Sequence, residues 1–419
     1  KQEFVMRCEK KIWQETTINT ISFLILIGFF SAVVFTYIMN TAFHQSYPYS
    51  TFLFQPKDQF NDFIHIYNIC KGFNPYNANY FFSSNYFPFT NALFFLFTLI
   101  SPKQLSMIVF FLLFLILYSI IACYVNHKYS LGLSPISSFL IFCMNYPLLF
   151  ALDRANIELY LFIFISVFLI SYINKRYVLA AIFLAFAVSM KLFPAVFFIM
   201  FIREKKWKET LIFILTCFAI TTVSLFFHQG GIVHNFLLMI RQMNGFGLSY
   251  DSLVSYHFNN SFAGLFIVAV AWLLQLFGHR PRAVFKIADR IQFNNLYTII
   301  VLLFFICLCI YLWKNRTNLR YTVLVLTISM ISLPVISYDY KLIHMLIPLL
   351  FFIRTDEKIV PYLITLLMIP KPYYFIFNDI SVGVIINSSL LFLLLAIAFF
   401  RIVLKNEKTM QPVIETCNN

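Results

Sequence analysis

Apolar runs of close to twenty residues recur along this chain of 419 residues, and they constrain its fold more than any other feature. A helix needs ~20 such residues to cross the hydrocarbon core of a membrane. Backbone exposed to lipid must satisfy its own hydrogen bonds, so spanning elements are helices or closed barrels. The alternating pattern of barrel strands is absent here. The sequence therefore predicts an all-α integral membrane protein, a multi-span helical bundle.

The basic residues of this chain are grouped between the apolar runs. Only 11% of residues are charged, yet the formal net charge is +14, which by itself could suggest a nucleic-acid partner. Short clusters of Lys and Arg at the ends of spans are topology signals instead, because basic loops stay on the cytoplasmic side. We therefore expect no nucleic acid and place these groups in the cytoplasm: 174–176, 203–208, 314–320, Arg401 and Lys405.

The apolar runs predict a single polytopic domain over residues 1–419, with ten to thirteen spans. The charged segment 1–18 is expected in the cytoplasm, the first span from Asn19 to Met39, an outer loop over 40–86, and a cytoplasmic tail over 405–419. Further apolar segments follow at 87–100, 105–125, 136–151, 157–173, 178–202, 210–227, 262–278, 297–313, 321–337, 342–353, 359–369 and 381–404.

Simple counting of crossings fails at three places. The basic groups 174–176 and 203–208 share one side, so segment 178–202 must cross twice or dip in and return. It contains Lys191 and Pro194, and proline removes a backbone donor, so we predict a helix broken at "SMKLFP". One segment between residues 87 and 151 must also fail to span, and the same difficulty surrounds 262–278.

The longest mixed stretch of the chain runs from Gln59 to Phe89, in the loop after the first span. A helix is predicted there from about Asp58 to Lys71, ended by Gly72 and a turn at 74–75. Its apolar stripe, at i, i+3, i+4 and i+7, consists of Phe60, Phe63, Ile64 and Tyr67. The opposite face collects Asp58, Asp62 and His65. A surface amphipathic helix with solvated acids would show the same pattern.

Charged residues also stand inside or beside the apolar segments, where they are costly unless paired or facing water. "DRAN" and the following "IE" place Asp153, Arg154, Asn156 and Glu158 at the start of a fully apolar span; neutralisation of Arg154 for topology alone is the alternative. Lys191 is isolated in its segment and suited to hold a phosphate as a point charge.

Polar groups occur at the edges of two late segments as well. They are His257, Asn259, Asn260, Asp339, Tyr340, Lys341 and His344, and each could be an ordinary interfacial residue. Asp339 and His344 do not share a helical face, so a direct dyad is not predicted. The eight cysteines lack ligand spacing, so neither a zinc site nor a disulfide framework is indicated. No nucleotide-binding, zinc-protease or serine-hydrolase motif is present.

The order of these motifs resembles that of the GT-C glycosyltransferases. An acid and "GFNPY" in the first outer loop are followed by "YFPF", "DRAN", "MKLFP" before "REKKWK", "NNSFAGL" and "SYDYKLIHML". The chain is most similar to glycosyltransferase family 87, the polyprenol-phosphate-mannose-dependent mannosyltransferases, over about residues 55 to 350. It departs from the family at "YFPF", where Tyr-Pro-Pro is more frequent, and at "DRAN", where Gly-Gln often follows the basic position.

The resemblance implies an inverting transfer of a hexose, with mannose first, from a polyprenyl-phosphate donor to a lipid or glycan acceptor. The site would face the outside of the membrane, in a GT-C bundle whose first outer loop carries short amphipathic helices. Asp62 matches the first-loop acid, the general base, and His344 matches a late cavity-facing His counted as catalytic. The implied substrate-binding set is Asp58, His65, Arg154, Asn156, Lys191 and Asn260. Within it, Lys191 and Arg154 would neutralise the lipid phosphate, and Asp58 competes with Asp62 for the base role.

Two other functions fit the same composition. A transporter or flippase of lipid-linked sugars would use the cations without a base, although inverted repeats are not seen. A polymerase of lipid-linked saccharides would favour a large late outer loop, as at 228–262. No metal or other cofactor is expected, because Lys and Arg can meet the phosphate charge. The bias toward Phe, Ile, Asn and Lys indicates an AT-rich bacterial genome, and hence the inner membrane with the site facing the periplasm.

Overall fold

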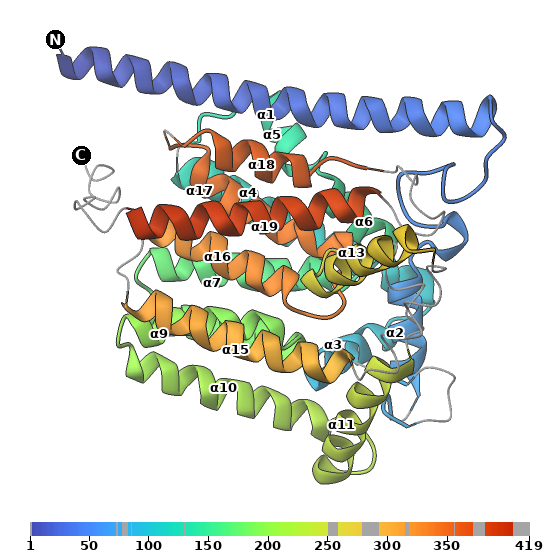
Figure 1. The fold of residues 1–419 in the computed structure, drawn as a ribbon. Coiled ribbons are helices and arrows are strands. Elements are labelled where there is room, and N and C mark those ends of the chain that lie inside the picture. The colour runs from blue at the N-terminus through green and yellow to red at the C-terminus, as the bar shows by residue number, and fades with distance from the viewer. Residues whose placement is uncertain are drawn as a thin grey trace.

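The computed structural model describes residues 2–404 except 73, 78–82, 85, 130, 250–258, 279–292, 315–317, 356 and 372–381. These described parts contain helices and no named strand (Figure 1). The helices are α1 (Gln2–Thr41), η1 (Pro56–Asp58), α2 (Asn61–Lys71), α3 (Pro88–Thr98), α4 (Lys103–Lys128), α5 (Pro135–Phe142), α6 (Tyr146–Arg154), α7 (Glu158–Ile173), α8 (Tyr177–Met190), η2 (Phe193–Phe198), α9 (Ile199–Arg203), α10 (Trp207–Phe226), α11 (Ile232–Ser249), α13 (Phe262–Leu276), α15 (Phe293–Lys314), α16 (Leu319–Ser332), η3 (Asp339–Met345), α17 (Leu346–Phe352), α18 (Ile359–Leu367) and α19 (Val382–Leu404).

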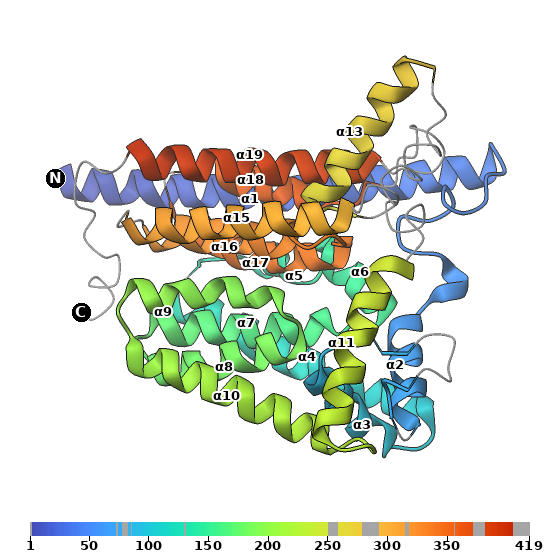
Figure 2. The same ribbon diagram turned by 60° about the horizontal axis from the view of Figure 1, so that its bottom comes forward.

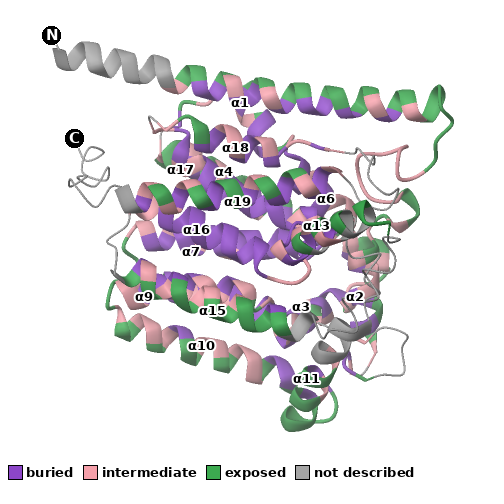
Figure 3. Ribbon diagram, in the orientation of Figure 1, coloured by how far each residue is buried: buried purple, intermediate pink, exposed green. Residues whose placement is uncertain are grey.

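Long helices surround short ones in this bundle. Among the described residues, five helices are long and apolar enough to cross a membrane, and the bent pair of α5 and α6 makes a sixth. Long helices such as α4, α10 and α15 expose much of their apolar surface, whereas the short helices α7 and α16 are almost entirely buried (Figure 3). The all-α membrane fold is confirmed, and a count of ten to thirteen spans requires the short elements to be included.

The basic loops meet at one end of the bundle, which we call the basic end. The guanidinium of Arg203 donates to Thr322 Oγ1 at 3.0 Å, which joins the end of α9 to the start of α16. The ammonium of Lys206 lies 4.2 Å from the centre of the Tyr177 ring. Arg401 pairs with Glu357 at 3.2 Å, so the end of α19 lies there too. The described parts of the loops predicted to share one side therefore lie at one end of the bundle, whereas residues 315–317 and Lys405 lie outside the described residues.

The segment from 178 to 202 is broken as predicted. Helix α8 ends at Met190, Lys191 is extended, and the chain returns to the basic end through η2 and α9. Helix α3 has 11 residues and packs on α2, so we propose it as the segment between residues 87 and 151 that does not cross the membrane. Segment 262–278 contains α13, which leaves the bundle at an angle in Figure 2, and the basic stretch after it lies outside the described residues.

Helix α1 packs closely against the segment after α18. A Cβ added at Gly28 would lie 2.6 Å from Ile369 Cβ, a contact that ordinary structures do not allow. We therefore expect Gly28→Ala to lower the free energy of unfolding by about 1–3 kcal/mol through overpacking, although alanine is the better helix former. Denaturation in detergent would measure it. Val33→Leu, which also adds one carbon but at a half-exposed position, should change stability by less than about 0.5 kcal/mol.

Helices α2, α3 and α11 gather at the opposite end, which we call the loop end (Figures 1 and 2). Asn74 of "GFNPY" donates to Asn235 Oδ1 of α11 at 2.7 Å. Asn235 in turn donates to the carbonyls of Leu225 and His228, at 3.1 and 3.0 Å. The first loop is thereby fastened to α11 and to the end of α10, and this fastening gives the Asn of the motif a structural role.

The imidazole of His228 should make this fastening sensitive to acid. Burial lowers the pKa of His228 from 6.5 to about 4. The unfolded chain therefore takes up a proton near pH 6.5 that the folded protein does not, so stability falls as the pH drops from 6.5 toward 4. The full loss would be about 3 kcal/mol at 1.36 kcal/mol per pKa unit. Hydrogen exchange in α11 should rise over this range, and His228→Phe should flatten the profile; equal acid sensitivity in both proteins would contradict this.

Candidate active site

A main-chain contact joins the first loop to the turn between α6 and α7. The backbone N–H of Phe60 donates to the carbonyl of Asp153 at 2.8 Å. Phe60 and Ala155 both have left-handed backbones, with φ of 59° and 49°. Such conformations cost free energy in residues other than glycine and persist where the surrounding structure imposes them. The contact sets the loop carboxylates directly over the "DRAN" turn.

Asp62, at the start of α2, is held on both carboxylate oxygens. Arg154 donates to its Oδ1, and Asn156 Nδ2 donates to its Oδ2 at 2.5 Å. The same guanidinium contacts Asp58 Oδ2 at 3.2 Å. The side chain of Asp62 is 17% exposed and that of Asp58 is 40% exposed. One arginine therefore orients two carboxylates, of which Asp62 is the more enclosed.

A second charged group begins at Glu158, the first residue of α7. Its carboxylate has no exposed surface and is bound on both oxygens, by Lys191 Nζ at 2.6 Å and by His344 Nε2 at 2.9 Å. Lys191 reaches it because the break after α8 leaves this residue extended. His344 is itself fully buried in η3. A buried carboxylate is costly unless paired, and these two contacts pair both oxygens of Glu158.

Aromatic rings surround the ammonium groups of this second group. Lys191 Nζ lies 5.6–5.8 Å from the ring centres of Tyr86, Phe193 and Tyr340. Lys341, only 5% exposed, lies 4.3 Å from the ring of Phe193 and donates to the carbonyl of Ile336 at 2.8 Å. The ring of Phe193 therefore lies near both ammonium groups. Of the two, Lys191 is bound directly to the buried carboxylate of Glu158.

Asn156 connects the two groups. Its Nδ2 holds Asp62, and its Oδ1 accepts the backbone N–H of Glu158 at 2.9 Å. The group of Asp58, Asp62 and Arg154 carries one net negative formal charge. The adjoining group of Glu158, Lys191 and Lys341 carries one net positive formal charge. The arrangement thus places a carboxylate able to accept a proton beside a cationic site able to bind an anion.

A third polar group lies around Asp339, which is buried. Asn260 Nδ2 donates to its Oδ1 at 2.6 Å, Tyr146 donates to its Oδ2 at 3.0 Å, and Asn387 contacts it at 3.4 Å. Asp339 and His344 thus bind different partners, as the helical positions indicated. Within the described ranges, no three His, Cys, Asp or Glu side chains are grouped to hold a metal ion.

The sequence model of glycosyltransferase family 87 matches residues 85–337, more than half of the chain. The chain belongs to glycosyltransferase family 87. No curated protein matches it. The match includes Arg154, Asn156, Lys191 and Asn260 but begins after Asp62 and ends before His344. The argument that the first loop belongs to the site of this glycosyltransferase therefore depends on the contacts of Asp62 with Arg154 and Asn156 and not on the family match.

The structure brings most of the predicted residues of this glycosyltransferase together. Asp58, Asp62, Arg154, Asn156, Lys191 and His344 belong to the two linked groups. Asn260 lies in the separate group around Asp339. His65 is half-buried on α2, where desolvation lowers its pKa and the charge of Asp62 acts in the opposite direction.

Two expectations for the loop of this glycosyltransferase are corrected. Helix α2 begins at Asn61, because Phe60 adopts a left-handed backbone, so Asp58 lies in the separate turn η1. The two acids therefore do not share a helix face as predicted; Arg154 brings them together instead. Gly72 does follow the helix, but with an extended backbone of φ −74°.

Glu158 and Lys341 are both candidate polar residues at the edges of apolar segments, but the catalytic and substrate-binding set implied by the resemblance includes neither of them. Their pairing could not be foreseen because Glu158 and His344 are 186 positions apart. His344 has no exposed side-chain surface, so its catalytic role stays a prediction, and its observed contact is with Glu158.

Proposed function

We propose that this protein is an inverting glycosyltransferase that moves a hexose from a polyprenyl-phosphate donor to a lipid or glycan acceptor at the outer face of the membrane. The observation that carries the proposal is the charge arrangement: an enclosed carboxylate, Asp62, stands beside a cationic site at Lys191. The resemblance to polyprenol-phosphate-mannose-dependent enzymes makes mannose the first sugar to test. By the positive-inside rule the basic end belongs in the cytoplasm. The loop end, with the site, would then face the outside of the membrane.

Asp62 is proposed as the general base. The acceptor oxygen attacks the anomeric carbon of the sugar, the bond from that carbon to the phosphate oxygen breaks, and the polyprenyl phosphate leaves with the electron pair. The acceptor proton passes to Asp62, which still has lone pairs when it accepts from Arg154 and Asn156. We assign Arg154 to holding Asp62, because its guanidinium already contacts both loop carboxylates.

Lys191 and Lys341 are proposed to bind the departing phosphate. The donor is a phosphodiester with one negative charge, which matches the net formal charge of the group around Glu158. The polyprenyl phosphate gains a second negative charge as it leaves, and the same two ammonium groups would stabilise it. Glu158 and His344 would act as positioning residues that keep Lys191 in place before the donor arrives. Fixed charges directed at a developing anion lower the barrier without reorganisation.

The depth of the site also supports a lipid-linked donor. Helix α7 has 16 residues, and at ~1.5 Å per residue it spans ~24 Å, less than the ~30 Å of hydrocarbon. Helix α4, with 26 residues, exceeds that thickness. With the far end of α7 at the cytoplasmic surface, Glu158 therefore lies short of the outer surface, and Lys191 lies beside it. A phosphate attached to a hydrocarbon chain can reach that depth more easily than a soluble sugar nucleotide can.

A transfer assay tests the proposal. Membrane vesicles containing the protein would receive polyprenyl phosphates carrying radiolabelled mannose, glucose or galactose, or the corresponding sugar nucleotides. We expect label to move into lipid or glycan only from a lipid-linked donor. Transfer from sugar nucleotides alone would contradict the donor class. Movement of the intact lipid-linked sugar across the vesicle, without transfer, would contradict the reaction and support transport.

A further inference from the structure

The turn that leads into η3 is held by the side chain of Asn259, which stands shortly before α13. Its Oδ1 accepts the backbone N–H of Ser337 at 2.8 Å, and its Nδ2 donates to the carbonyl of Val335 at 2.9 Å. Asn259 is fully buried, and its backbone pairs with that of Tyr338 in an isolated antiparallel bridge. One amide side chain therefore holds the turn at two points.

The peptide group between Ile336 and Ser337 is bound at both of its polar ends. Its N–H, on Ser337, donates to Asn259. Its carbonyl, on Ile336, accepts from the ammonium of Lys341 at 2.8 Å. A peptide group is planar and rigid, so a shift of the N–H end also moves the carbonyl end. The position of the Lys341 ammonium therefore depends on Asn259, although the two side chains belong to different segments of the chain.

Ser261 and Gly264 support Asn259 in this position. Ser261 Oγ donates to the same Val335 carbonyl at 2.8 Å and accepts the N–H of Gly264 at 2.9 Å. The N–H of Ser261 donates to Asn259 Oδ1 at 3.1 Å. A Cβ added at Gly264 would lie 2.9 Å from the carbonyl oxygen of Asn259, so a larger residue would displace Asn259. The segment "NNSFAG" is thus built around the contact with the turn.

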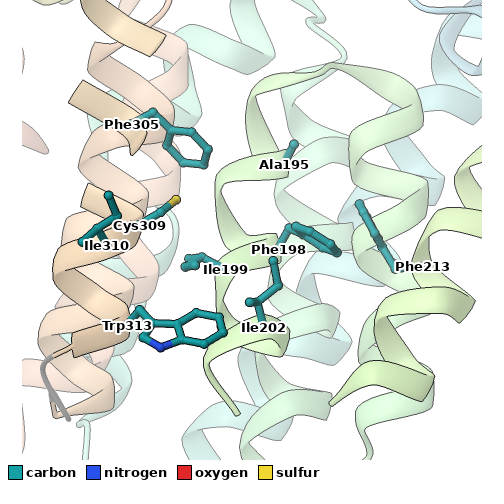
Figure 4. A pocket seen from close by; sticks show the side chains of 9 residues that line it. All are labelled: Ala195, Phe198, Ile199, Ile202, Phe213, Phe305, Cys309, Ile310 and Trp313. Atoms are coloured by element: carbon teal, nitrogen blue, oxygen red, sulfur yellow. The ribbon is translucent and has the colours of Figure 1, made fainter. Parts of the chain in front are cut away.

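A second contact of the Lys341 ammonium, with the ring of Phe193, is less directional. The distance to the ring centre is 4.3 Å, and the attraction of a cation to a ring face tolerates a range of positions. Phe193 begins η2, and Ala195 and Phe198 of the same element line an apolar cleft of about 640 Å³ against α15 (Figure 4). One side of η2 therefore borders open space. The hydrogen bond to Ile336 is the contact that gives the ammonium a fixed direction.

We propose that Asn259 is a positioning residue that fixes the ammonium of Lys341 for the donor phosphate. The inference rests on the proposed function, in which Lys341 and Lys191 share that phosphate, and it adds a residue that acts through Lys341. An ammonium has three N–H groups, so the one bound to Ile336 sets the direction of the others. A cation fixed in this way binds the phosphate with less reorganisation. Asn259 itself contacts neither donor nor acceptor.

Reductive methylation of lysine reads the position of Lys341 without donor or acceptor. The purified full-length protein in lipid nanodiscs would be treated with formaldehyde and a borohydride, and peptide mass spectrometry would follow each lysine. Lys341 is 5% exposed in the wild type and should react slowly. Asn259→Ala releases the Ile336–Ser337 peptide, so we expect methylation of Lys341 to become at least about tenfold faster, the factor produced by ~1.4 kcal/mol of lost hydrogen bonding.

Two further variants complete this test. Asn91→Ala is the matched control, because Asn91 is equally buried but lies on α3 and binds Ser84 and Cys70, so Lys341 should react as in the wild type. Gly264→Ala removes no polar group but presses on the carbonyl of Asn259. It should also accelerate methylation of Lys341, and it serves if Asn259→Ala fails to fold.

Binding of a radiolabelled polyprenyl phosphate connects the position of Lys341 to the site. Asn259→Ala should weaken binding by about three- to tenfold, as the loss of one directed hydrogen bond does. In the Lys341→Met protein the same substitution should have no further effect, because a residue that acts through another loses its effect when that residue is gone. A purely structural role would lower stability in both backgrounds and would not show this dependence.

The outcomes separate this inference from the proposed function. Unchanged methylation of Lys341 in both Asn259→Ala and Gly264→Ala would overturn the inference. An undiminished effect of Asn259→Ala on binding in the Lys341→Met protein would overturn it too. Absence of polyprenyl phosphate binding in the wild type would instead contradict the proposed donor, and the methylation rates would still decide whether Asn259 positions Lys341.

Discussion

Asp62→Asn is expected to reduce sugar transfer by about 10²–10⁴-fold, the range that a positioned general base contributes. Asparagine has nearly the same shape, so the packing of α2 should survive, but its amide cannot take the acceptor proton. Transfer from the lipid-linked donor would be measured at saturating donor, at equal protein level. Binding of a radiolabelled polyprenyl phosphate to the purified protein should stay at the wild-type level, because the phosphate is bound at Lys191 in this proposal.

Asp58→Asn is the matched control. Asp58 is the more exposed of the two acids and also accepts from Asn61, at 3.0 Å, within its own turn. Loss of its charge removes one of the two carboxylates that contact Arg154, but Asp62 remains to accept the proton. We therefore expect transfer to fall by less than about tenfold, well below the loss expected on removing a general base. A larger loss in Asp58→Asn than in Asp62→Asn would transfer the base role to Asp58.

Lys191→Met is expected to destabilise the fold as well as abolish transfer. The substitution keeps an unbranched side chain but leaves Glu158, which has no exposed surface, without its ammonium partner. Removing one member of a buried ion pair costs about 3–5 kcal/mol, because the remaining charge is not compensated. Denaturation in detergent would measure the loss of unfolding free energy.

The double variant Glu158→Gln with Lys191→Met separates structure from chemistry. Neither buried charge remains in it, so most of the lost stability should return. Transfer should stay absent, because Lys191, the cation directly bound to Glu158 in the wild type, is no longer there to meet the phosphate. If Lys191→Met alone left both stability and transfer at wild-type levels, the assigned role of the Lys191–Glu158 pair would be wrong.

The sequence was most informative where local rules decide the structure. Apolar runs identified the helical membrane fold, basic clusters identified one end of the bundle, and Pro194 near an isolated Lys191 identified the broken helix. Each of these inferences uses residues within one segment. The corresponding structural features agree with them.

The pairing of charges could not be predicted from the sequence in the same way, because it depends on contacts between segments that are far apart along the chain. Nothing local indicates that Glu158 binds both Lys191 and His344. The left-handed backbone of Phe60 was also not foreseen, since only the contact with Asp153 in another helix explains it. Periodicity alone continued the helix through Phe60 and so placed Asp58 and Asp62 on one face.

The short central helices also bear on how the protein enters the membrane during synthesis. Helix α8 has 14 residues, and η2 and α9 together have 11, fewer than the ~20 that span a bilayer. Neither half is long enough to be released into lipid alone, and the bend between them carries a charged lysine. The two halves would have to leave the translocation channel as a pair, with α7 already present to shield them. The order of synthesis agrees with this, since α7 precedes them and places Glu158 where it can receive Lys191.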